Sequence, residues 1–153
     1  YCHATAFKIN ADVMRGDGER AYRELKKIMP DSETTPYEVS GALPYTLTSC
    51  YATNEHIWGK TGRPWLTGSQ GWMMRCVVEG FLGIQKAYGG FYVTPAMPDD
   101  WNEAECMIER NGTEYVFTIK RTGVESITVD GVMQKQSFVA FSEKERVCVD
   151  ITM

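Results

Sequence analysis

Between residues 65 and 82 the chain reads WLTGSQGWMMRCVVEGFL. The pattern predicts a loop that ends at about Ser69 and a helix over residues 69–82. A helix with apolar residues on most of its faces is usually buried among other helices. The stretch therefore predicts that other helices surround this segment. Its apolar positions are Trp72, Met73, Cys76, Val77, Phe81 and Leu82.

Two more helices are predicted toward the N-terminus. The first ends at Gly16, and the second covers residues 18–29, with Asp17 as its N-cap and Pro30 as its stop. The very short turn between them is typical of antiparallel helix pairs. Apolar residues recur at helical spacing in both, at Phe7, Ala11 and Met14 in the first and at Ala21, Leu25 and Ile28 in the second.

The segments between the second and third helices look irregular. Residues 31–41 are rich in Ser, Thr, Pro and Glu and predict a loop. Pro44 can start a short helix over residues 44–51, because proline suits the first position of a helix. Residues 54–65 form a second predicted loop, which contains Gly59, Gly62 and Pro64.

After Gly90 the apolar residues alternate with a period of two, which is typical of strands. Asn111-Gly112 and Asp130-Gly131 predict two-residue hairpin turns. Asn111 also begins a glycosylation sequon, but we interpret the pair as a turn. Short strands separated by turns favour an antiparallel sandwich, and they are expected around Tyr115, Phe117 and Ile119, around Ile127 and Val129, and at residues 138–141 and 147–151.

The two halves predict an α+β fold that divides near residue 88. Residues 1–88 would be helical, and residues 89–153 would form the small antiparallel sheet domain. About four helices are too few to close a bundle around the apolar segment at 69–82. We therefore expect this chain, which opens at Tyr1 rather than at a methionine, to be a fragment.

Composition narrows the classes of partner. The net charge is −4 and the isoelectric point is about 5.2, which disfavours nucleic acid and anionic membranes as partners. No apolar run approaches the ~20 residues of a membrane span.

The five cysteines form no CxxC pair, which favours reduced thiols in a cytoplasmic protein. Only His3 and His56 are histidines, and no acidic partner stands at ligand spacing, so we expect no metal site.

The WLTGS stretch at residues 65–69 is a candidate anion site. A loop ends there and a helix begins, and the unpaired N–H groups of a helix start favour an anion. Gly68 would let the anion approach the backbone, and the hydroxyls of Thr67 and Ser69 would add donors. The alternative is simple capping by Thr67 or Ser69, with the tryptophans as core residues.

Other polar and aromatic residues are ambiguous when taken alone. His3 stands near a helix start and has either a structural or a ligand-binding role. Asp31 and Glu38 lie in predicted loops, but no second carboxylate pairs with either, so we assign them no acid or base role. Aromatic residues that could stack on sugar rings, or equally pack in a core, are Tyr45, Trp58 and Trp65.

Several motifs in order resemble one known family. They are His3 at a helix start, GDGERA at residues 16–21, Pro44-Tyr45, WLTGS at residues 65–69, LGI at residues 82–84, Tyr88 with Gly90, Pro95 to Pro98, and Trp101. Their order closely resembles the C-terminal half of glycoside hydrolase family 94, which includes cellobiose, chitobiose and cellobionate phosphorylases. The likeness covers roughly residues 1–101, with a β tail of the expected kind after it.

The resemblance implies a fold and a phosphate site. Residues 1–88 would be the last helices of an (α/α)6 catalytic barrel, and residues 89–153 a C-terminal β-sandwich domain. Phosphate would be bound by His3, Thr67 and Gly68, the site that the helix-start argument also selects, with Ser69 beside them. Inorganic phosphate would be a co-substrate, and the resemblance implies no cofactor.

The implied reaction is inverting phosphorolysis of a β-linked disaccharide, catalysed by a glycosyltransferase-type phosphorylase. Phosphate attacks the anomeric carbon while a carboxylic acid protonates the leaving oxygen, so no base has to activate water. The general acid is an aspartate that lies upstream of the match, so we expect no catalytic residue in this chain and an inactive fragment. Many members have a glutamine after the Pro-Tyr motif where this chain has Ser49, which leaves the donor sugar open; Ser49 and Tyr45 are the candidate sugar-binding residues.

Two other functions stay open. The chain could belong to a non-catalytic carbohydrate-binding or structural module, or to a cyclic-glucan-processing transferase that uses the same phosphate cradle. The expected partners are phosphate, a disaccharide or oligosaccharide, and the rest of the barrel. The resemblance also implies a homodimer.

Overall fold

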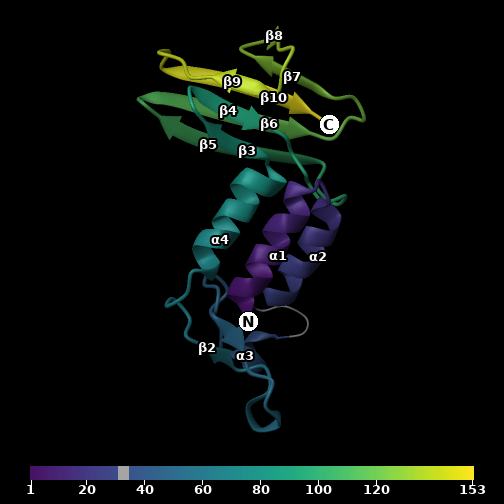
Figure 1. The fold of residues 1–153 in the computed structure, drawn as a ribbon, viewed down its shortest axis with the longest axis vertical. Coiled ribbons are helices and arrows are strands. Elements are labelled where there is room, and N and C mark those ends of the chain that lie inside the picture. Colours follow the sequence, from purple (N-terminus) through teal and green to yellow (C-terminus); the bar gives the residue numbers. More distant parts are fainter. Residues whose placement is uncertain (31–34) are drawn as a thin grey trace. The chain divides into compact units, whose positions relative to one another are not determined.

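The computed structural model describes residues 1–30 and 35–153 (Figure 1). The chain splits into two compact units, Tyr1–Val77 and Val78–Met153, which are described separately. Within the described residues, no helix has the length and apolar character needed to cross a membrane. Helix and sheet are both present, as the α+β prediction requires.

The first unit opens with a helix pair, α1 (Cys2–Met14) and α2 (Gly18–Ile28), which pack on each other (Figure 1). The Asp17 side chain accepts a hydrogen bond of 3.1 Å from the backbone N–H of Arg20, so the predicted N-cap is confirmed. The predicted apolar stripe of α2 is also confirmed, because its members are buried: Ala21, Leu25 and Ile28.

The first predicted helix is confirmed as α1, but the residues whose spacing predicted it are not its buried face. Phe7, Ala11 and Met14 are exposed, and the buried face instead carries Cys2, Ala6, Ile9 and Val13. Both sets have helical spacing, so periodicity alone could not choose between them. The buried set has smaller side chains at most positions, which lets α1 approach α2 and α4 closely.

Between α2 and α4 the chain forms short elements. They are α3 (Tyr37–Ser40), β1 (Cys50–Tyr51), the 3-10 turn η1 (Glu55–Ile57) and β2 (Thr61–Gly62), and β1 pairs antiparallel with β2. The first part of the predicted 31–41 loop, including Asp31, lies outside the described residues, and α3 occupies part of the rest.

The predicted helix over residues 44–51 is wrong. This segment is irregular until it enters β1, and the Thr48 hydroxyl bonds to the carbonyl oxygens of Gly62 at 2.7 Å and Cys50 at 3.1 Å. Threonine and serine side chains that bond to the backbone compete with helix formation. The Thr-rich stretch thus prefers to pair with β2.

The predicted helix over residues 69–82 is confirmed as two successive elements. The α-helix α4 (Ser69–Arg75) is followed by a π-helical turn, η2 (Cys76–Phe81). In the first unit, Met73 and Cys76 are buried, and the Cys76 thiol lies 3.5 Å from the carbonyl oxygen of Ala6 on α1. The α4 helix therefore packs against α1, and this contact positions the candidate site described below.

The second unit is built from two sheets. One has the order β3-β4-β9, and the other has the order β5-β6-β10-β7-β8. The strands are β3 (Ile84–Ala87), β4 (Gly90–Val93), β5 (Glu103–Arg110), β6 (Thr113–Lys120), β7 (Ser126–Val129), β8 (Val132–Met133), β9 (Phe138–Ala140) and β10 (Arg146–Thr152). The β6–β10 pair is parallel, so the expectation of a purely antiparallel arrangement is wrong at this pair. The other pairs in the two sheets are antiparallel, as predicted.

Both predicted hairpin turns are confirmed. Asn111 and Gly112 have φ angles of 54° and 79° and join β5 to β6. Asp130 and Gly131 have φ angles of 48° and 77° and join β7 to β8. Positive φ at both central residues matches the turn whose twist suits two paired strands.

An aromatic core joins the two sheets of the second unit. Phe91 on β4 lies 5.2 Å from Tyr115 and 5.6 Å from Phe117, both on β6, between ring centroids. The predicted alternation on β6 is confirmed, because Tyr115, Phe117 and Ile119 are fully buried.

The strands β3, β4 and β5 were not predicted, and β5 in particular carries charged residues at half of its positions.

Candidate functional site

The predicted anion-binding residues come from two helix starts that lie against each other. His3 is in the first turn of α1, and Gly68 is the N-cap of α4. A Cβ atom placed on Gly68 would lie 2.6 Å from Cε1 and 3.0 Å from Nε2 of His3. Contacts this short are essentially never made by a real Cβ, so the imidazole occupies space that only a glycine leaves free.

One ring nitrogen of His3 is unpaired. Its Nε2 is buried and has no hydrogen-bond partner among the described residues, although the side chain as a whole is half-buried. Leaving a buried polar group unpaired costs about 1–3 kcal/mol. A hydrogen-bond acceptor at this position would therefore stabilise the site.

Thr67 and Ser69 form a small hydroxyl pair beside Gly68. The two hydroxyl oxygens are 2.8 Å apart, and the Ser69 backbone N–H donates to Thr67 Oγ1 at 3.2 Å. Part of the capping alternative is thus present. Ser69 is fully buried and Thr67 is half-buried, so Thr67 is the more accessible member of the pair.

The loop before this pair has an unusual backbone. Arg63 and Trp65 have φ angles of 54° and 71°, in the left-handed region that residues other than glycine rarely adopt. Such strained positions cluster at functional sites. Sequence reasoning gave no signal for them, because neither residue type favours this conformation.

The comparisons with known proteins concern the same residues. The family model described as "Glycosyl hydrolase 94 superfamily, catalytic domain" matches residues 1–83, more than half of the chain. The chain belongs to this family.

Two of the relatives are named as phosphorylases. The chain is 36% identical over 138 residues to a solabiose phosphorylase of Paenibacillus borealis, covering 86% of this chain and 18% of the relative. It is 28% identical over 137 residues to an N,N'-diacetylchitobiose phosphorylase of Vibrio proteolyticus, covering 86% of this chain and 17% of the relative.

A further relative is the cyclic β-(1,2)-glucan synthase NdvB of Rhizobium meliloti. The identity is 27% over 146 residues, covering 90% of this chain and 5% of the relative. This chain thus spans less than a fifth of the length of the relatives it matches. All of the predicted phosphate-binding residues lie within the part of the chain that the family model covers.

The candidate sugar-binding residues of this family member lie on the loops near the two helix starts. Tyr45 and Trp65 are 67% and 58% exposed, and their ring centroids are 6.0 Å apart. Neither ring is part of the core that this chain forms by itself. Ser49 contributes through its backbone, because its carbonyl oxygen accepts a 2.9 Å hydrogen bond from the N–H of Cys2 at the start of α1.

The remaining sequence candidates do not join this site. His56 is exposed beside Glu55, and Trp58 is 63% exposed. Within residues 1–30 and 35–153, no group of three or more His, Cys, Asp or Glu residues could hold a metal ion. The five cysteines are free thiols, and burial raises the pKa of the Cys2 thiol next to His3.

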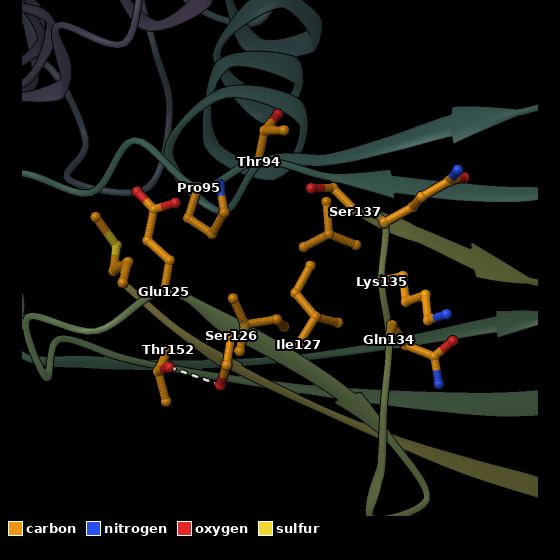
Figure 2. A pocket seen from close by; sticks show the side chains of 13 residues that line it. Thr94, Pro95, Glu125, Ser126, Ile127, Gln134, Lys135, Ser137 and Thr152 are labelled. Atoms are coloured by element: carbon orange, nitrogen blue, oxygen red, sulfur yellow. Dashed lines mark hydrogen bonds between the residues drawn. The ribbon is translucent and has the colours of Figure 1, made fainter.

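A cavity of about 430 Å³ lies in the second unit, away from any predicted site residue (Figure 2). Two of its hydroxyls are engaged internally, because Ser126 and Thr152 bond to each other at 2.9 Å and Thr152 also donates to the Val124 carbonyl at 2.6 Å. The Glu125 carboxylate also lines it. Lys135 lines it as well (Figure 2), so the wall carries one side chain of each charge, and none of the predicted phosphate-binding residues takes part in it.

Phe7 and Trp72 are the residues at the site whose role sequence reasoning missed. The Phe7 ring lies 4.8 Å from the His3 ring and 4.7 Å from the Trp72 ring. Sequence analysis counted both only as apolar positions on a helix. The spacing of His3 and Phe7, one helical turn apart, was the one available signal that they touch.

Proposed function

We propose that this chain is the part of a family 94 glycoside phosphorylase that binds inorganic phosphate. His3, Thr67 and Gly68 would contact the phosphate, and Ser69 would orient the Thr67 hydroxyl. The observation that supports this most is the contact between His3 and Gly68, with an unpaired Nε2 at the same place. The phosphorylase names of the relatives support the reaction class.

The proposal includes the architecture that the family resemblance implies. The first unit would supply the last helices of an (α/α)6 barrel, with the remaining helices in a part of the protein outside this chain. The second unit would be the C-terminal β-sandwich domain. The aromatic core shared by its two sheets supports this second assignment. The homodimer and the cytoplasmic location stay predictions.

The proposed reaction is inverting phosphorolysis of a β-linked disaccharide. A phosphate oxygen forms a bond to the anomeric carbon, the glycosidic C–O bond breaks, and a general acid gives its proton to the leaving oxygen. The products are a sugar 1-phosphate and the released sugar. The acid is an aspartate expected in the part of the protein outside this chain, so residues 1–153 alone should be inactive.

The role of these residues would be positioning and charge stabilisation. Phosphate is already an anion, so it must be fixed and oriented in line with the bond that breaks. Thr67 Oγ1 accepts the Ser69 N–H, and when it also accepts the Ser69 hydroxyl proton its own proton is free for phosphate. His3 Nε2 and the Gly68 backbone would supply further donors.

The test is steady-state kinetics on full-length enzyme carrying His3→Ala or Thr67→Val. Each substitution removes a hydrogen bond to a charged group, worth about 1.5–3 kcal/mol. We expect the KM for phosphate to rise by about tenfold or more, while the KM for the disaccharide changes little. An unchanged phosphate KM in both variants would overturn the site assignment.

The similarity to a cyclic β-(1,2)-glucan synthase supports a second candidate, a glucan-processing transferase domain. The two functions differ in their substrates. A disaccharide phosphorylase converts a disaccharide and phosphate to a sugar 1-phosphate, and its phosphate KM depends on the cradle. A transferase domain with the same cradle would act on glucan chains instead, so activity on a disaccharide panel compared with a glucan separates the two. A non-catalytic module would show neither activity and would lack the aspartate acid elsewhere in the protein.

A further inference from the structure

His3 is the end member of a row of aromatic rings that joins two helices. Its imidazole packs on Phe7 with ring centroids 4.8 Å apart and planes inclined by 55°. Phe7 in turn meets Trp72 edge to face, at 4.7 Å and 81°. His3 and Phe7 are one turn apart on α1, and Trp72 is in the first turn of α4.

Trp72, at the other end of the row from His3, has a second contact. The Arg75 guanidinium lies over the Trp72 ring, 5.3 Å from its centroid, one turn further along α4. A cation over an indole face is attracted by the electrons of the ring. Trp72 is therefore fixed from two sides, by Phe7 and by Arg75, and is a firm backing for Phe7.

The imidazole also lies against the Gly68 backbone. The ring has so little room there that a Cβ would approach to 2.6 Å. A histidine ring otherwise has a broad preference about its second side-chain torsion, so it needs contacts to hold one orientation. Here the contacts with Phe7 and with Gly68 restrict the orientations that the imidazole can adopt.

We propose that Phe7, backed by Trp72, is a positioning residue that holds the His3 imidazole against Gly68 with Nε2 at the phosphate. This inference rests on the proposed phosphate site. Phe7 does not contact phosphate itself, and its contribution acts through His3. The rings at positions 7 and 72 thus belong to the phosphate site although neither carries a group that binds an anion.

Phe7 lies outside the buried face of α1. The side chain is 47% exposed, while the buried face of α1 is formed by Cys2, Ala6, Ile9 and Val13. A large apolar side chain that is half outside the core contributes less to folding than a buried one. Replacing it should therefore change phosphate binding more than stability.

The first test compares Phe7→Leu with Phe7→Tyr in the full-length enzyme. An edge-to-face aromatic pair is worth about 0.5–1.5 kcal/mol beyond the buried area, so losing the ring should raise the KM for phosphate about 2- to 12-fold. Phe7→Tyr keeps the ring and should stay within about twofold of wild type. Met14→Leu, at a 75% exposed position of the same helix, is the matched control and should change nothing.

The second test is a double-mutant cycle with His3→Ala. If Phe7 acts only through His3, Phe7→Leu raises the phosphate KM in wild type but has no further effect once His3 is absent. A further loss of the same size in the His3→Ala background would show that Phe7 acts independently, and would overturn the inference. An unchanged phosphate KM for Phe7→Leu in the wild-type background would overturn it as well.

The cycle also separates this inference from the proposed function. If His3→Ala itself leaves the phosphate KM unchanged, the phosphate site is misassigned and both fail. If His3→Ala raises the KM and Phe7→Leu does not, the phosphate site stands and only the positioning role of Phe7 fails. Thermal denaturation of each variant identifies a general loss of folding, which would lower the melting temperature and the apparent kcat without a selective rise in the KM for phosphate.

Discussion

Gly68→Ala is the perturbation that the structure defines most closely. The new methyl group would start 2.6 Å from Cε1 of His3, against at least 3.4 Å for an ordinary contact. The imidazole must therefore retreat by about 0.8 Å, the difference between these two distances. Phe7 lies against the same ring at 4.8 Å and limits where it can go.

The displacement is large for a hydrogen bond. A donor moved by this much from its acceptor loses most of the bond, and a bond to a charged group contributes about 1.5–3 kcal/mol. This corresponds to a rise of about 10- to 150-fold in the KM for phosphate. The backbone itself tolerates alanine, because Gly68 has a φ of −71°.

The assay is phosphorolysis by the full-length enzyme at increasing phosphate, with Gly71→Ala as the matched control. Gly71 is on the same helix, and a Cβ added there meets nothing within 4 Å. We expect Gly71→Ala to keep the wild-type phosphate KM and to stabilise α4 by up to about 1 kcal/mol. A wild-type phosphate KM in Gly68→Ala would refute the reasoning, because His3 would then have room that the structure denies it.

Three further predictions concern folding. Phe91→Ala, at a buried ring that touches Tyr115 and Phe117, should destabilise the second unit by about 3–5 kcal/mol in urea denaturation. Asp17→Ala removes the N-cap of α2 and should lower stability by about 0.5–2 kcal/mol, whereas Asp17→Asn should be nearly neutral. A hydrogen bond from Lys144 lowers the pKa of Asp130. The ionised Asp130 carboxylate therefore stabilises the folded protein fully above the ordinary aspartate pKa of about 3.9. This stabilisation is lost as the pH falls through the lower pKa that Asp130 has in the folded protein. Lys144→Met should move the Asp130 pKa, followed by carbon NMR, upward; no movement would contradict that cause.

Local signals in the sequence predicted local structure well. Asp17 marked the start of α2, and the pairs Asn111-Gly112 and Asp130-Gly131 marked two hairpins, because each feature depends on residues that are neighbours in the chain. The alternation of Tyr115, Phe117 and Ile119 marked β6 for the same reason.

Features that depend on distant partners were missed. The buried face of α1 is chosen by α2 and α4, so Phe7 and Met14 were wrongly placed on the apolar stripe. The helix expected over residues 44–51 was displaced by pairing of β1 with β2, and the parallel β6–β10 pair follows from a long connection that no turn signal marks. Strand β5 was missed because its charged residues hide the alternation.

In the candidate site, too, local features were predicted and features that depend on distant partners were not. Residues 65–69 were recognised as a helix start, but local chemistry could not separate an anion site from a cap. The order of several motifs brought His3 to the same site, and the structure places its ring against Gly68. The burial of Ser69 and the backing by Phe7 and Trp72 depend on packing between helices, which the sequence alone did not predict.

The most direct test of the central claim is phosphorus NMR of the full-length protein with a β-linked disaccharide and inorganic phosphate. The account predicts a growing sugar 1-phosphate signal as the inorganic phosphate signal declines, and a much slower change in His3→Ala at the same low phosphate concentration. Sugar release without a phosphate ester, or an equal rate in His3→Ala, would contradict it.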